Sequence, residues 1–133
     1  MPALDTNVLV RYLVQHDAAQ LAAARRLIRK CVTEGQALFI PVTVSLELEW
    51  VLRSNFGFGK GAVVQTLSDL LSSAELTFES ERALEVALLL YNEGSADYSD
   101  CLHIALAFEA GEQPLWTLDK VASKVDGGRL LST

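Results

Sequence analysis

The sequence has little cysteine, proline or glycine: its 133 residues include two cysteines, three prolines and eight glycines. Cys31 and Cys101 cannot build a disulfide framework and match no zinc-binding spacing, so we expect two buried, reduced thiols. So little glycine and proline excludes a fibrous or low-complexity protein. No apolar run approaches the ~20 residues that span a bilayer, so we expect no membrane partner.

The sequence also lacks an excess of basic residues, since 11 Lys and Arg against 17 Asp and Glu give a net charge of −6. Taken alone, this balance argues against a nucleic-acid partner, because phosphate binding relies on Lys and Arg. The argument fails if several carboxylates gather to hold divalent cations, because formal charge then misstates the local field. The opening segment has no basic leader and carries Asp5 and Arg11 within its apolar part, so we expect no signal peptide and a cytoplasmic location.

The apolar content is sufficient for one folded domain. Half of the residues are hydrophobic and 21% are charged, which excludes a disordered chain. A chain of this length buries roughly two-thirds of the surface that its unfolded form exposes. We therefore expect a single domain over residues 1–133, without linkers or internal repeats.

Strands and helices alternate along the chain. Short apolar runs predict strands at residues 3–5, 37–40, 76–78, 115–118 and 129–131. Capping signals predict one helix capped by Thr6 or Asn7, a second capped by Asp17 and a third opened by Thr43 or Ser45, followed by helices over residues 62–72, 81–92 and 98–109. In the second helix, the spacing predicts a buried face formed by Leu21, Ala24, Leu27, Ile28 and Cys31 or Val32. This alternation predicts an α/β fold, with a mainly parallel central sheet flanked by helices.

Several carboxylates fall where such a fold places functional groups, at the carboxyl ends of strands. Asp5 and Asp119 each close a predicted strand, and Glu47 lies among apolar residues of a predicted helix. Asp97 and Asp100 are three residues apart and share one face at the start of another helix. Each has a simpler explanation when taken singly, as a helix cap for Asp5 or Asp97 and as a turn residue for Asp119. We interpret Glu49 as a solvated residue on the side opposite Glu47.

Convergence of these carboxylates would predict a metal site. Crowded carboxylates without basic neighbours repel one another unless they are protonated or share a cation. Oxygen ligands select Mg²⁺ or Mn²⁺ rather than zinc. Such ions suit phosphodiester cleavage, because they polarise the phosphate and generate hydroxide from bound water.

Four segments together, residues 4–9, 47–52, 97–105 and 117–120, resemble the PIN-domain family, and most closely its VapC-type bacterial toxins. The resemblance covers residues 3–131, with the motifs in order. It implies a metal-dependent endoribonuclease that is the toxin of a type II toxin–antitoxin pair. It also implies RNA as substrate, a homodimer and a neutralising antitoxin protein.

Carried over residue by residue, Asp5, Glu47, Asp100 and Asp119 match the family's acidic quartet. The resemblance implies that Asp5 and Asp100 are the main ligands of Mg²⁺ or Mn²⁺. Glu47 would bind the metal or position the water, and Asp119 would assist directly or through water. The supporting polar positions are Thr6, Asn7 and Thr117, with Asp97 ranked below the quartet.

Several other polar residues have both a functional and a structural interpretation. Arg11 and Lys120 adjoin the acidic ends and are candidate RNA contacts, whereas for Arg25, Arg26, Arg29 and Lys30 a solvated helix face is favoured over an RNA-binding stripe. His103 lies one turn from Asp100, and we favour a half-buried, hydrogen-bonded side chain over a contact with substrate or antitoxin. Tyr12 and Tyr98 could stack on a base, but we favour packing.

Two alternatives remain for the function. A haloacid-dehalogenase phosphatase also begins with a strand ending in Asp, but Asn7 occupies the place of its acid/base and cannot transfer a proton. A catalytically inert PIN-like module that sequesters a protein or RNA partner is the second alternative. The sequence names neither the RNA target, nor Mg²⁺ against Mn²⁺ and the number of ions, nor the antitoxin family, nor the dimer interface.

Overall fold

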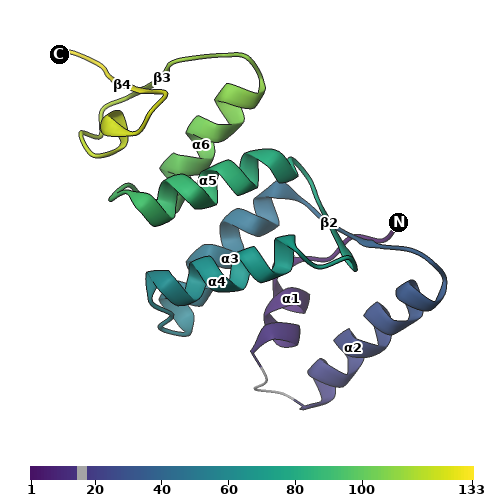
Figure 1. Ribbon diagram of the computed structural model, residues 1–133. Coiled ribbons are helices and arrows are strands. Elements are labelled where there is room, and N and C mark those ends of the chain that lie inside the picture. Colours follow the sequence, from purple (N-terminus) through teal and green to yellow (C-terminus); the bar gives the residue numbers. More distant parts are fainter. Residues whose placement is uncertain (15–17) are drawn as a thin grey trace. The chain divides into compact units, whose positions relative to one another are not determined.

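The computed structural model describes residues 1–14 and 18–133, which divide into two compact units, Met1–Glu79 and Ser80–Thr133 (Figure 1). Within the described residues, the first unit contains α1 (Thr6–Leu13), α2 (Ala18–Thr33), β1 (Leu38–Ile40), α3 (Val42–Asn55), α4 (Lys60–Leu71) and β2 (Leu76–Phe78). The second unit contains α5 (Glu81–Glu93), α6 (Tyr98–Glu109), β3 (Leu115–Thr117), the 3-10 helix η1 (Ala122–Lys124) and β4 (Gly128–Leu130).

Each unit contains one pair of parallel strands. In the first, β1 pairs with β2 in the register Leu38↔Leu76, and Ala3 adds a single parallel bridge to Phe39. In the second, β3 pairs with β4 in the register Leu115↔Gly128. The helices α3 and α4 connect β1 to β2, whereas the segment that connects β3 to β4 contains only the short η1. The predicted α/β fold with parallel strands is therefore confirmed.

The core of each unit is built from the apolar positions of its helices and strands. In the first unit, Leu9, Leu38, Ile40, Leu48 and Leu52 have no exposed surface. In the second, α5 and α6 pack on each other and bury Leu84, Ala87, Cys101, Leu102 and Ile104. Cys31 and Cys101 are buried and form no disulfide, as expected. Among the described residues, no helix is long and apolar enough to cross a membrane.

The starts of three helices differ from the prediction. α1 is capped by Asp5, whose carboxylate accepts a hydrogen bond from the Val8 N–H at 3.0 Å, so Thr6 lies inside the helix. α3 begins at Val42, where the backbone N–H donates to Glu79 Oε1 at 2.8 Å, so neither Thr43 nor Ser45 opens it. Glu79 directly follows β2 and is far from Val42 in the sequence, so the residues around Val42 could not predict this hydrogen bond. α4 begins at Lys60 rather than at residue 62.

The second helix buries fewer residues than the periodicity suggested. Ala24 and Ile28 are buried, and of the alternatives Cys31 and Val32 it is Cys31 that is buried, whereas Leu21 is half-buried and Leu27 is 36% exposed. The buried face of α2 is thus a narrow stripe that excludes Leu27. The predicted cap, Asp17, lies outside the described residues.

Strand β2 has its predicted bounds and β4 is shifted by one residue, whereas the other predicted strands are shorter than expected. β1 and β3 begin or end one residue inside the predicted ranges, and the first predicted strand is reduced to the bridge at Ala3 because Asp5 already caps α1. η1 was not predicted from the sequence; it follows from contacts of the Asp119 side chain. By contrast, α6 has the predicted bounds, with Asp97 at its N-cap.

Candidate active site

Asp5 lies where the chain leaves its contact with β1 and enters α1. Its exposed carboxylate uses Oδ1 to cap the helix, so the capping role expected of it is confirmed. A carboxylate offers about four lone-pair sites, and one capping bond leaves most of them available. Capping thus fixes the direction of Asp5 without preventing it from holding a cation.

Thr6 and Asn7, the next two residues, have different environments. Thr6 is buried, and its hydroxyl oxygen has no hydrogen-bond partner among the described residues. An unsatisfied buried hydroxyl costs roughly 1–3 kcal/mol. Asn7 is exposed. An unsatisfied polar atom directly after Asp5 is the kind of defect that functional sites tolerate.

The two glutamates of α3, Glu47 and Glu49, have different environments. Glu47 is exposed, as a ligand-binding carboxylate should be. Glu49 is buried, with a side chain only 6% exposed, and forms an ion pair with Arg53 at 2.9 Å. The interpretation of Glu49 as solvated is therefore wrong. The spacing to Arg53 is i,i+4, which allows the pair to form on one helix face.

Asp100 lies in the first turn of α6. Among the described carboxyl groups, it has a clearly shifted pKa. Burial raises the pKa of Asp100 above its ordinary value, and the negative charges of Asp119 and then Asp97 raise it further. His103 lowers it in part. Asp119 and Asp97 are thus each near enough to Asp100 to repel its carboxylate.

The sequence predicts the burial of two residues near Asp100, His103 and Tyr98, and the structure confirms it only for Tyr98. His103 is exposed rather than half-buried, because it faces away from the packed side of α6. Tyr98 is buried and meets Tyr91 edge-on, with ring centroids 5.5 Å apart and an interplanar angle of 75°. Packing, the favoured reading for Tyr98, is confirmed, and its ring is not available for stacking on a base.

Asp119 follows β3 and is fixed by its own turn. Its Oδ1 accepts hydrogen bonds from the Val121 and Ala122 N–H groups at 2.8 and 2.9 Å, which starts η1. Its backbone N–H donates to Thr117 Oγ1 at 3.0 Å. The turn role is confirmed, and Thr117 supports Asp119 directly. Lys120 is exposed beside it.

The described residues bring some of the predicted set together. Asp97, Asp100, His103 and Asp119 interact within the second unit, and Asp5, Asn7 and Arg11 line one cavity of the first, with Glu47 elsewhere in that unit. Among the described residues, no three His, Cys, Asp or Glu side chains form a ready-made metal-binding group. The donor set itself consists of carboxylates, which are the ligands that Mg²⁺ and Mn²⁺ prefer, and the repulsion at Asp100 is of the kind a cation relieves.

One residue of the cavity was missed by the sequence reasoning. Gln20 on α2 accepts a hydrogen bond from Arg11 Nε on α1. Periodicity places both residues on helices but does not reveal which helices meet, so no sequence signal pointed to the pair.

The comparison with known families gives the class of this protein. Residues 3–128 match the PIN domain, and the chain belongs to that family. PIN domains are generally metal-dependent nucleases. A search of the curated proteins found no match.

Proposed function

We propose that this chain is a Mg²⁺- or Mn²⁺-dependent endoribonuclease, the toxin of a bacterial type II toxin–antitoxin pair. The observation that carries the nuclease proposal is the match of residues 3–128 to the PIN domain, and the raised pKa of Asp100, caused by burial and by the charges of Asp119 and Asp97, supports it. Charge repulsion is costly to maintain, and a bound cation gives it a use. The toxin role rests on the resemblance to VapC-type proteins.

The proposed roles are those that the resemblance to the PIN family implies. Asp5 and Asp100 are the main metal ligands, and the exposed Glu47 binds the metal or orients the attacking water. Asp119 assists directly or through water, supported by the Thr117 hydroxyl. A bound divalent ion supplies polarisation of the phosphate and an activated water. Thr6, Asn7 and Asp97 support these groups, and Arg11 and Lys120 contact the RNA backbone.

Two protein partners belong to the proposal. An antitoxin would direct a basic side chain into the acidic set, best an Arg, whose planar fork pairs with carboxylates in a bidentate way. It would add an amphipathic helix beside the segment of residues 56–61. A second copy of this chain would form a homodimer through apolar helix faces.

The proposal is tested by incubating the protein with total RNA in Mg²⁺, in Mn²⁺ and in chelator, and mapping the new RNA ends. We expect cleavage only with a divalent ion, and none from Asp100→Asn. Asp69→Asn is the matched control, because Asp69 is an exposed carboxylate on α4 outside the proposed set. RNA binding without cleavage in any ion would favour the inert binding module instead.

A further inference from the structure

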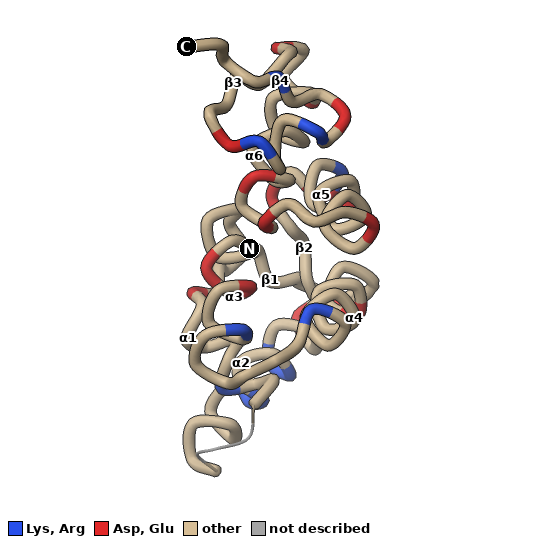
Figure 2. The backbone as a smooth tube through the Cα atoms, turned by 90° about the vertical axis from the view of Figure 1, so that its left-hand side faces the viewer, with Lys and Arg blue, Asp and Glu red and all other residues tan. Residues whose placement is uncertain are grey.

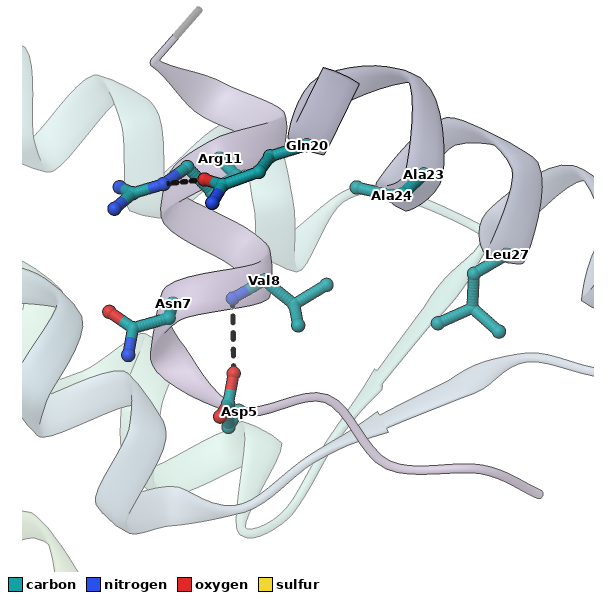
Figure 3. A pocket seen from close by; sticks show the side chains of 8 residues that line it. All are labelled: Asp5, Asn7, Val8, Arg11, Gln20, Ala23, Ala24 and Leu27. Carbon is teal, nitrogen blue, oxygen red and sulfur yellow. Dashed lines mark hydrogen bonds between the residues drawn. The ribbon is translucent and has the colours of Figure 1, made fainter. Parts of the chain in front are cut away.

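A cavity of about 500 Å³ lies between α1 and α2 of the first unit (Figure 3). Its polar part comes from Asp5, Asn7, Arg11 and Gln20, and its apolar part includes Val8 and Leu27. In Figure 3, Asn7 and Arg11 extend to the same side of α1, whereas Val8 and Leu27 point into the space between the helices. Its volume is within the roughly 300–1,000 Å³ of ordinary small-molecule pockets. The α1–α2 cleft is therefore large enough for a nucleotide.

Arg11 lines the cleft on the side of α1 to which Asn7 also extends, and it is hydrogen-bonded to α2 (Figure 3). Its Nε–H donates to the side-chain oxygen of Gln20, so α2 anchors a guanidinium that belongs to α1. A guanidinium is planar and carries five N–H donors, of which this bond uses one. Fixing Nε sets the plane of the fork and thus the direction of the two terminal amino groups. These groups have the geometry for bidentate contact with a phosphate.

The charge of α2 favours an anionic ligand. Its sixteen residues, Ala18–Thr33, include four basic side chains and no Asp or Glu, in a chain whose net charge is −6. Figure 2 shows Lys and Arg gathered along this helix. Arg25, Arg26, Arg29 and Lys30 are all exposed, which confirms the solvated face and leaves their field open to a polyanion. The overall acidity of the chain is therefore a poor guide to this surface.

We propose that the α1–α2 cleft is a nucleotide subsite for single-stranded RNA, in which Gln20 is a positioning residue that holds Arg11 against a backbone phosphate beside Asp5. This inference rests on the proposed ribonuclease function. Asp5 in the same cleft repels an anionic ligand unless the two share a cation, and the proposed function supplies that cation for a phosphodiester. Val8 and Leu27 pack against the base or ribose, and the Asn7 amide, on the same side of α1 as Arg11, offers a donor to the phosphate backbone.

The test measures RNA affinity against salt concentration. All variants carry Asp100→Asn so that the probe, a fluorescent single-stranded RNA, stays intact. Each phosphate contact to a single strand contributes about 0.7 to the slope of log affinity against log salt. Arg11→Gln should weaken binding roughly tenfold, or about 1.4 kcal/mol, and lower that slope by about 0.7.

Two substitutions of Gln20 separate positioning from simple packing. Gln20→Leu keeps the Arg11 charge but releases its orientation, so affinity should fall while the slope changes little. Gln20→Glu keeps the shape and pairs with Arg11, which cancels its charge, so the slope should fall as in Arg11→Gln. A merely structural role would lower the melting temperature in both and leave both slopes unchanged. If Arg11→Gln does not fold, Arg11→Lys, which keeps the charge and loses the fork, should reproduce the Gln20→Leu result.

The matched control is Arg25→Gln, which removes the same charge from α2 outside the cleft. It should alter the slope far less than Arg11→Gln, and an equal change would overturn the subsite. An unchanged slope of log affinity against log salt in Gln20→Glu would also overturn the RNA subsite. It would favour a protein as the ligand of the cleft. Failure of the parent function is distinguishable, since the native chain would then leave RNA intact in Mn²⁺.

Discussion

Asp100 and Asp119 lie close enough for the negative charge of Asp119 to raise the pKa of the Asp100 carboxyl. The position of Asp119 is fixed by two backbone N–H donors in its turn, and that of Asp100 by the first turn of α6. Neither carboxylate can therefore move away freely to relieve the repulsion. A cation between them, or removal of one charge, would relieve it.

We expect Asp100→Asn to raise the melting temperature of the metal-free protein near neutral pH. A raised folded-state pKa contributes stability below the unfolded value of about 3.9, and that contribution is lost as pH rises through the folded value. The native protein loses it toward neutrality, whereas the amide has no charge to lose. Melting curves in chelator at acidic and neutral pH measure the difference.

The same melting curves, measured in Mn²⁺, test whether the protein binds the metal. The native protein should gain stability that grows with ion concentration, and Asp100→Asn should gain less. A native protein that gains nothing from Mn²⁺, or a variant that melts lower in chelator, would remove the basis for the metal site.

Two substitutions of Asp5 should separate its capping role from its proposed catalytic role. Asn is as good an N-cap as Asp, so Asp5→Asn should keep its stability and lose metal-dependent cleavage. Asp5→Ala should lose both activity and about 1 kcal/mol of stability, because the bond to the Val8 N–H disappears. Circular dichroism melts paired with RNA cleavage rates check this. Cleavage by Asp5→Asn above about a tenth of the native rate would contradict its role as a metal ligand.

The homodimer prediction can be directed to one helix. α4 buries Val63, Leu67 and Leu70, whereas α5 leaves Val86 37% and Leu89 54% exposed. The sequence offers two apolar helices, residues 62–72 and 81–92, as contributors to a dimer, and we therefore expect the second to form the interface. Light scattering should show a dimer at tens of micromolar, and Leu89→Lys should shift it toward monomer. The equivalent change at Val32, which is also exposed, should leave the dimer intact.

Features with a local cause could be predicted from the sequence. α6 was predicted with its observed bounds because an acidic N-cap precedes it and Gly111, which has a positive φ of 76°, follows it. The capping role of Asp5 and the turn role of Asp119 also depend on residues two or three positions away. Because these hydrogen bonds join residues that are close in the sequence, the sequence alone could predict them.

Features with a distant cause could not be predicted. Glu79 satisfies the start of α3 from far along the chain, and the α1–α2 cleft exists because two helices meet. Glu49 shows a further reason, since hydropathy assigns a glutamate to solvent although Arg53 lets it be buried. That pair was present in the spacing, and the i,i+4 rule was the signal that would have found it.

Glu47 and Glu49 provide the last prediction, because they are the same residue type two positions apart on α3 with opposite environments. Glu47→Gln removes an exposed carboxylate, so stability should stay within about 0.5 kcal/mol while metal-dependent cleavage falls strongly.

Glu49→Gln is the matched control. It breaks a pair whose acidic member is buried and whose Arg53 side chain is 49% exposed, so the loss should be about 1–2 kcal/mol, below the cost of a fully buried pair. Its cleavage rate per folded molecule should stay native. Urea unfolding gives the stabilities, and RNA cleavage in Mn²⁺ gives the rates. The reverse pattern, with activity lost at Glu49 and kept at Glu47, would transfer the acidic role to the buried residue and require the Arg53 pair to open during catalysis.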